Sequence, residues 1–192
     1  MSSDPPCAAA AALIAELGLE AHPEGGFYRR VYTSPARSSP AAVAPPSPGG
    51  AAAWPHFASS SSPAGAAAER PAATAIHYLL TAGSVSRLHV LKSDELWFHH
   101  AGGALTVLER RGDGSVAATQ LGGGPGGRAF HSVAAGTAFG AELPPGSGWA
   151  LVSCVVVPGF DFADWRLVSR DEALAGLDPA SAEAEALRRI TL

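Results

Sequence analysis

Residues 83–102 read GSVSRLHVLKSDELWFHHAG, and this stretch decides the fold. It contains two runs typical of β-strands, Ser86–Leu91 and Glu95–His100. The turn sequence Lys-Ser-Asp at 92–94 separates the runs, and glycines close both ends of the stretch. This pattern predicts two neighbouring strands of a sheet protein.

The two predicted strands bring a histidine close to a carboxylate. Because side chains alternate between the faces of a strand, Arg87 and His89 are predicted to point inward, and Glu95 and Trp97 to face them from the next strand. A His–Glu pair in a desolvated interior suits acid–base chemistry. A satisfied polar network in a barrel core is the structural alternative, and the sequence leaves both open.

Short strands continue on both sides of this stretch. They recur about every 10 residues with turn residues between them, a spacing typical of an all-β sandwich or barrel. The expected strands are 27–33, 74–80, 86–91, 95–100, 105–110, 115–120, 129–133, 136–142, 150–157 and 160–168. A short helix at Cys7–Leu17 precedes them and a helical tail begins at Ser169, so we predict a β-barrel with helical ends.

Residues 34–73 have a different composition from the rest of the chain. They contain 14 Ala, 8 Pro, 8 Ser and 3 Gly, together 33 of 40 positions. Such a segment buries too little apolar surface to offset its ordering entropy. We therefore expect a disordered or loosely attached insertion in one domain that spans residues 1–192. A docking loop anchored by Trp54 is the alternative.

Charge and cysteine usage exclude several classes of partner. The chain has 13 Lys and Arg against 17 Asp and Glu, a net charge of −4, which argues against nucleic-acid binding. It has no run of 18 apolar residues, so we expect no membrane span. Cys7 and Cys154 lie far apart without a CxxC pair, which fits a reducing compartment, and we expect a cytoplasmic protein.

The spacing within residues 83–102 resembles the first motif of the cupin superfamily, glycine-x5-His-x-His-x3-Glu-x6-Gly. The matching positions are Gly83, His89, Glu95 and Gly102. Leu91 stands where the second histidine belongs. In most metal-binding cupins this motif supplies two histidines and a glutamate, and a second motif supplies one more histidine.

The second cupin motif is also incomplete, with Phe139 in place of its histidine and Leu143 in place of its asparagine. Two remaining ligands are fewer than the three or so that hold a catalytic zinc. We therefore expect no cofactor, while a divalent transition metal in a rebuilt site stays open. The ligands of that rebuilt site would be His77, His89, Glu95 and His99.

The resemblance extends to a family of small cupin-like proteins known only as a domain of unknown function. The matching stretches are residues 13–34, LIAELGLEAHPEGGFYRRVYTS; residues 74–102; residues 150–167, ALVSCVVVPGFDFADWRL; and the final LRRITL. The resemblance implies a double-stranded β-helix, or jelly-roll barrel, and a homodimer. It also implies a fold similar to nucleotide-deoxysugar epimerases and seed storage proteins, although fold does not confer function.

Several residues are candidates for catalysis or ligand binding in the barrel. The candidate catalytic residues are His89, Glu95 and Tyr78, and the candidate ligand-binding residues are Arg87, Trp97, Glu24 and Tyr28. Arg29 and Arg30 lie on opposite faces of one strand, so at most one faces the interior.

Three functions remain open from the sequence. The first is binding of a small carbohydrate-like or acidic molecule, with metal-free isomerase or epimerase chemistry. The second is a non-catalytic binding or structural dimer. The third is a metal-dependent cupin enzyme, against which the missing ligands at positions 91 and 139 argue.

Overall fold

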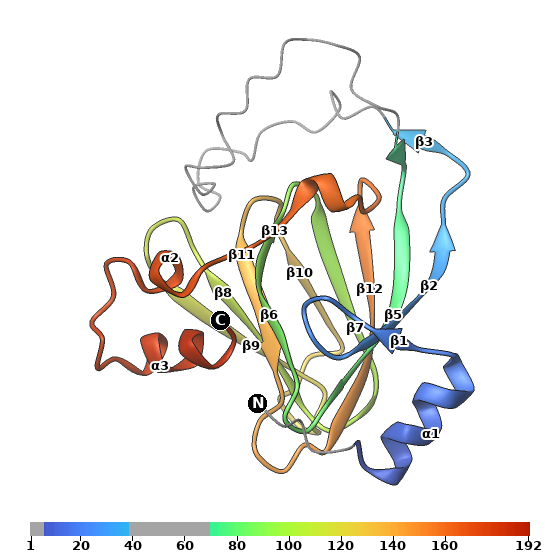
Figure 1. The fold of residues 1–192 in the computed structure, drawn as a ribbon, viewed down its shortest axis with the longest axis horizontal. Coiled ribbons are helices and arrows are strands. Elements are labelled where there is room, and N and C mark those ends of the chain that lie inside the picture. The colour runs from blue at the N-terminus through green and yellow to red at the C-terminus, as the bar shows by residue number, and fades with distance from the viewer. Residues whose placement is uncertain (1–5, 39–69) are drawn as a thin grey trace.

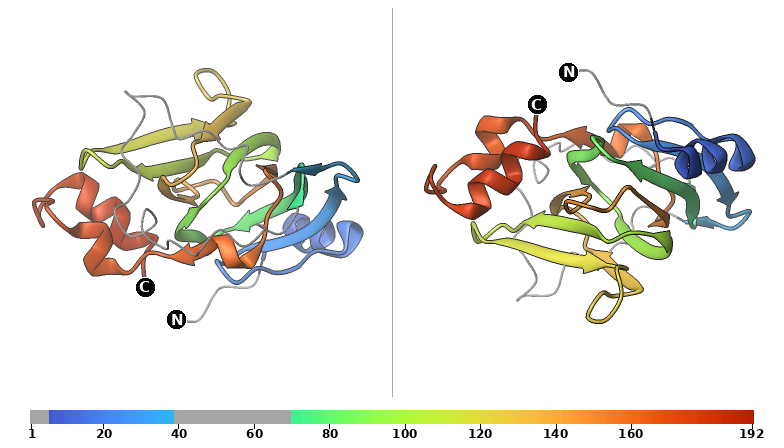
Figure 2. Two further views of the ribbon diagram at one scale, coloured as in Figure 1. Left: turned by 90° about the horizontal axis from the view of Figure 1, so that it is seen from above. Right: turned by 90° about the horizontal axis from the view of Figure 1, so that it is seen from below.

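A computed structural model of the chain describes residues 6–38 and 70–192. Its main feature is a pair of antiparallel sheets that face each other, as the views from above and below show (Figure 2). The strands are β1 (Glu20–Ala21), β2 (Phe27–Thr33), β3 (Arg37–Ser38), β4 (Arg70–Pro71), β5 (Thr74–Thr81), β6 (Val85–Leu91), β7 (Asp94–Gly102), β8 (Leu105–Arg110), β9 (Val116–Leu121), β10 (Phe130–Val133), β11 (Ala138–Glu142), β12 (Trp149–Val157) and β13 (Trp165–Leu167).

The order of the strands in the two sheets confirms the expected jelly roll. One sheet has the order β1-β2-β5-β12-β7-β10 and the other has the order β13-β6-β11-β8-β9 (Figure 1). Consecutive strands such as β5, β6 and β7 pass from one sheet to the other and back, which is the pattern of a double-stranded β-helix. The all-β prediction is therefore confirmed.

The core lies between the two sheets because inward positions alternate with outward ones. Along β12 the residues Ala150, Val152, Cys154 and Val156 are buried, and their neighbours in the sequence are partly buried or exposed. The interior cluster also contains Trp97 and Phe139, the two largest fully buried side chains. Part of this cluster, including Trp97 and Cys154, lines a cavity between the sheets.

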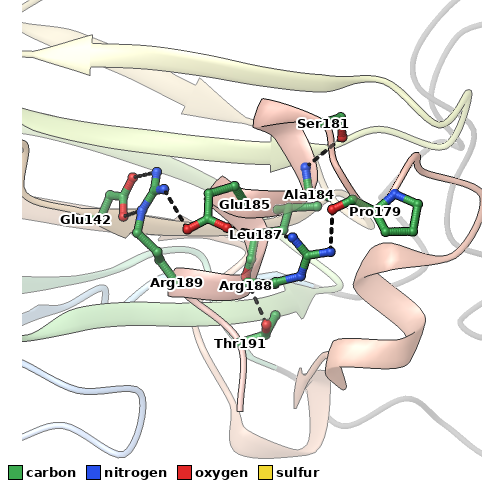
Figure 3. A network of polar contacts seen from close by, with 9 residues as sticks. All are labelled: Glu142, Pro179, Ser181, Ala184, Glu185, Leu187, Arg188, Arg189 and Thr191. Atoms are coloured by element: carbon green, nitrogen blue, oxygen red, sulfur yellow. Dashed lines mark hydrogen bonds and ion pairs between the residues drawn. The ribbon is translucent and has the colours of Figure 1, made fainter.

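The C-terminal helices α2 (Arg170–Leu174) and α3 (Ala182–Arg189) cover the outer face of the five-stranded sheet (Figure 1). Leu187 and Ile190 pack against Leu88 and Leu108, and all four are buried. Figure 3 shows the polar contacts that hold α3 in place. The guanidinium of Arg189 donates two hydrogen bonds of 2.8 Å to the carboxylate of Glu142 on β11.

The N-terminal helix α1 (Ala8–Leu17) covers one end of the outer face of the six-stranded sheet, where Ala10 packs near Leu79. It ends at Gly18 in the left-handed conformation, φ 60°, as its sequence predicts. Within the described residues, no helix is both long and apolar enough to cross a bilayer.

One prediction about secondary structure was wrong. The strand expected at 160–168 is instead a 3-10 turn, η2 (Phe162–Asp164), followed by the short strand β13, because the carboxylate of Asp161 accepts a hydrogen bond from the Ala163 amide. The expected disordered insertion begins and ends with paired backbone, since β3 and β4 form an antiparallel ladder. The rest of that insertion, residues 39–69, lies outside the described residues.

Candidate functional site

A cavity of about 210 Å³ opens between the two sheets. Its walls come from β1, β2, β5, β6, β7 and β12, from the loop before β2, and from the segment around η2. The lining residues are Glu20, His22, Glu24, Tyr28, Arg30, Thr74, Ile76, Tyr78, Ser86, His89, Leu91, Glu95, Trp97, Cys154, Val156, Phe160 and Phe162. The cavity thus gathers acidic, imidazole and aromatic groups in one partly enclosed space.

The loop before β2 delivers Glu24 to the cavity. The Gly25 amide donates to the His22 carbonyl at 3.0 Å, and the His22 amide donates to the Gly26 carbonyl at 3.0 Å. Gly25 has φ 108°, and a Cβ there would lie 2.2 Å from the Val85 carbonyl oxygen. Only glycine allows the loop backbone to lie this close to β6. The glycine of the HPEGG sequence therefore lets Glu24 lie against β6.

Glu24 is a buried carboxyl group with several donors around it. The indole N–H of Trp165 donates to its Oε1, and the Ser86 hydroxyl donates to its Oε2 at 3.2 Å. Burial nevertheless raises the pKa of Glu24 to about 7, because a carboxylate loses more by desolvation than these partners return. At neutral pH this group is therefore divided between its two protonation states.

Glu95 is the second buried carboxyl group of the cavity. Burial first, and then the charge of Glu24, raise the pKa of Glu95 to about 8, which a hydrogen bond from the Cys154 thiol only partly offsets. Glu95 therefore carries a proton at neutral pH. Burial first, and then the nearby Glu95, raise the pKa of Cys154 well above its usual range. Its thiol therefore stays protonated and unreactive in the wall of the cavity.

His89 is held as a neutral imidazole in a defined tautomer. Its Nδ1 lies 2.7 Å from the Arg87 carbonyl oxygen, which can only accept, so Nδ1 carries the proton. Nε2 is then unprotonated, and among the described residues no group donates to it. Burial lowers the pKa of His89 to about 4. The Oε2 of Glu24 lies 3.5 Å from Nδ1, on the protonated side of the ring.

The aromatic residues of the cavity differ in whether their polar atoms already have hydrogen-bond partners. The Tyr78 hydroxyl donates to the Gly25 carbonyl at 2.7 Å, and burial raises the pKa of Tyr78 well above its usual range. Tyr28 lies at the edge of the cavity, with its ring centroid 4.5 Å from that of His22. The indole nitrogen of Trp97 is buried without a hydrogen-bond partner within the described structure.

The structure corrects the expected position of Arg87. Register between β6 and β11 shifts, because Phe139 pairs with His89 but Ala141 pairs with Ser86. This bulge breaks the simple alternation, so Ser86 lines the cavity and Arg87 does not. The other candidate catalytic and ligand-binding residues do line it, namely Glu24, Tyr28, Tyr78, His89, Glu95 and Trp97.

The rebuilt metal site is also not assembled. His77 points to the outer face of the sheet, where its Nδ1 lies 3.3 Å from the Ser153 hydroxyl. His99 lies near the end of β7, with Nε2 3.0 Å from the Gly103 carbonyl oxygen. In the part of the chain that the structure describes, no three His, Cys, Asp or Glu side chains gather to hold a metal ion. The four expected ligands, His77, His89, Glu95 and His99, therefore do not come together as a metal site.

Reasoning from sequence missed three residues that line the cavity or contact its lining. Ser86 is displaced into the cavity by the bulge, which leaves no signal in a single sequence. Cys154 follows the alternation of inward and outward side chains along β12, so this alternation could have predicted its position in the cavity. Trp165 donates to Glu24 across 141 residues of chain, a contact that only tertiary folding creates.

The two facing sheets with a polar cavity between them define a small jelly-roll barrel of the cupin class. Comparison of the sequence with protein families confirms this class. The model described as "Cupin superfamily (DUF985)" matches residues 11–168, and the chain belongs to this family.

Two solved structures resemble the whole chain. One is the crystal structure of protein SO0799 from Shewanella oneidensis, with 30% identity, a TM-score of 0.71, and coverage of 100% of this chain and 99% of that one. The other is a hypothetical protein from Leishmania major, with 25% identity, a TM-score of 0.71, and coverage of 92% and 96%. A search of curated proteins found no match.

Proposed function

We propose that the cavity binds a small carbohydrate-like or acidic molecule and that its own side chains move a proton on that molecule. One observation carries the proposal. Two buried carboxyl groups with raised pKa values, Glu24 and Glu95, line the same small cavity as a neutral imidazole with a lowered pKa, His89. Groups whose pKa values are pushed apart in one site are typical of acid–base catalysis.

His89 is the proposed base. Its unprotonated Nε2 would take a proton from a carbon next to a carbonyl or carboxyl group of the ligand. The ring would then carry a positive charge, and the carboxylate of Glu24 at 3.5 Å from Nδ1 would stabilise that charge. Glu24 therefore acts on the reaction through His89, as a positioning residue.

Glu95 is the proposed acid, because it holds a proton at neutral pH and its pKa of about 8 lets it release that proton. It would protonate the ligand as His89 removes a proton, so that the molecule is rearranged without gain or loss of atoms. Tyr78 ranks second as a donor, since its hydroxyl is already bonded to Gly25. The cavity is smaller than the roughly 300–1,000 Å³ of drug-sized sites, which favours a monosaccharide or a smaller acid.

The test begins with a thermal-shift screen of D-glucose, D-glucuronate, glycolate and UDP-glucose. For each compound that binds, nuclear magnetic resonance in D2O would follow exchange of carbon-bound hydrogen for deuterium. We expect wild-type protein to catalyse exchange, and H89Q and E95Q to lose it while keeping their folds. H131Q is the matched control, because His131 makes a 2.8 Å contact with Glu109 in the same barrel but outside the cavity.

Each outcome separates the proposal from its alternatives. Binding without exchange in the wild type would reject the catalytic role and leave a binding protein. Exchange that survives in H89Q would reject His89 as the base. Exchange lost equally in H131Q would show that the variants act through general damage to the barrel.

The homodimer implied by the family resemblance stays a prediction. Phe98 and Phe130 stack on the outer face of the six-stranded sheet with ring centroids 5.0 Å apart, and they are 37% and 43% exposed. Such exposed apolar groups are compatible with a subunit interface. Light scattering after size exclusion would give the mass, and a monomer at micromolar concentration would contradict the prediction.

A further inference from the structure

We propose that Arg30 is an anion-recognition residue at the mouth of the cavity, and that the ligand is therefore a small organic molecule that carries a carboxylate or phosphate group. This inference rests on the proposed function only in assuming that the cavity binds a small molecule. It goes further by naming the chemical class of the ligand and the side chain that selects it.

The placement of Arg30 follows from the geometry of β2. Arg30 lies two residues after Tyr28, so both side chains lie on the inner face of the strand, and both line the cavity. Arg29 lies on the opposite face and donates to the Leu17 carbonyl at 3.0 Å. The structure thus decides which of the two adjacent arginines faces the cavity.

The guanidinium of Arg30 is held in place but keeps its hydrogen-bond donors. Its carbon lies 5.9 Å from the ring centroid of Phe160, which itself lines the cavity. A contact with the face of an aromatic ring restrains the group and leaves the N–H donors along its edge unused. Within residues 6–38 and 70–192, the side chain of Arg30 donates no hydrogen bond and forms no ion pair.

Among the residues that the structure describes, no other lysine or arginine lines the cavity. The ionisable neighbours there are carboxyl groups and imidazoles, and the two buried carboxyl groups, Glu24 and Glu95, are partly or wholly protonated at neutral pH. A third carboxyl group, Glu20 on β1, also lines the cavity, but among the described residues none of these three carboxyl groups forms an ion pair with Arg30. An arginine whose N–H donors are free can form two parallel hydrogen bonds to the oxygens of a carboxylate or of a phosphate.

A second unused donor lies deeper in the same cavity. Strand pairing places Arg30 opposite Ile76, Ile76 opposite Cys154, and Cys154 opposite Trp97, which forms one row across the six-stranded sheet. Three strand spacings separate the Cα atoms at the ends of this row by about 14 Å. The Trp97 indole N–H, 1% exposed and without a partner in the described residues, is at the inner end.

The two donors point to an acceptor-rich ligand. A buried N–H without an acceptor is costly, and an oxygen of the ligand would satisfy it. An anionic group at Arg30 and a hydroxyl or carbonyl oxygen at Trp97 together describe a sugar acid, a sugar phosphate or a small hydroxy acid. A neutral sugar would leave Arg30 without its ion pair.

The experiment compares three probes that differ in charge: D-glucuronate, glucose 6-phosphate and D-glucose. Isothermal titration calorimetry would measure their affinities for wild type, R30Q, R30K and R29Q. R29Q is the matched control, because it removes the same charge from the neighbouring position on the opposite face. We expect at least one anionic probe to bind wild type and R29Q roughly ten- to a hundredfold more tightly than glucose, the range of a hydrogen bond to a charged group.

R30Q should lose this preference. R30K should retain more of it for the phosphate than for the carboxylate, since lysine is a point charge without the planar fork. The stronger of the two anionic probes identifies the group that the ligand carries. Melting temperatures of all variants would establish that they fold.

Three results would overturn the inference. One is a preference for the anion that survives in R30Q, another is wild-type protein that binds glucose as tightly as either anion, and the third is no binding of either anion at millimolar concentration. Binding of an anionic probe that is lost in E95Q but not in R30Q would reject the role of Arg30 and leave the proposed cavity function intact.

Discussion

Replacement of Glu95 by glutamine tests the electrostatics of the cavity most directly. The folded-state pKa of Glu95 is about 8 against an ordinary value of 4.5, and burial is the main cause. Because the folded pKa is raised, the stability that comes from protonated Glu95 is fully present below pH 4.5. It is lost as the pH rises through about 8.

The magnitude follows from this linkage. Between pH 6.5 and 7.5 the carboxyl group is ionised in the unfolded chain but largely protonated in the folded protein. Over that interval Glu95 alone should lower the free energy of unfolding by about 1 kcal/mol. E95Q lacks the titration and keeps an acceptor for the Cys154 thiol, so the variant should gain about 1 kcal/mol relative to wild type over the same interval.

The assay is urea denaturation of both proteins at half-unit steps from pH 5 to pH 8. Taking the difference between them cancels the contributions of groups that do not interact with Glu95, including His89, whose lowered pKa makes stability rise with pH below about 6.5. E16Q, at an exposed position on α1, is the control and should show no such trend. A difference between wild type and E95Q that stays constant from pH 5 to 8 would refute the raised pKa of Glu95.

Three further predictions concern the fold, and urea denaturation measures each. G25A should lose at least about 1–3 kcal/mol, because its φ of 108° is strained for alanine and its Cβ would meet the Val85 carbonyl; full stability would contradict the close approach. L187A should lose about 2–5 kcal/mol, since Leu187 on α3 is fully buried against the five-stranded sheet, and a loss within error would contradict that packing. R189Q should lose less than about 1 kcal/mol despite its two hydrogen bonds to Glu142, because the pair is half-exposed; a larger loss, insensitive to salt, would contradict this.

The sequence predicted the class of fold because the signals for it are local. Alternating strand residues and turn glycines recur through the chain, and most expected strands agree with β2 and β5 to β12 within two residues. The helix stop at Gly18 was likewise readable, since a left-handed residue after an apolar stripe is a local requirement. The segment around Asp161 failed because a side-chain cap competes there with strand-forming residues.

The candidate site was predicted only where simple alternation holds. His89, Glu95 and Trp97 line the cavity as their spacing indicated. Because of a bulge in β6, Ser86 lines the cavity and Arg87, which was expected there, does not. A bulge depends on how one strand meets its partner, so a single strand does not reveal it.

Other features of the site arise only when distant segments pack together. The chain by itself determined that a histidine, two glutamates and several aromatic residues were available for a barrel interior. The tertiary structure decided the tautomer of His89, the protonation of Glu95 and the choice of Arg30 over Arg29. The physical reason is that desolvation and hydrogen-bond geometry depend on neighbours brought from remote parts of the sequence, such as Trp165 beside Glu24.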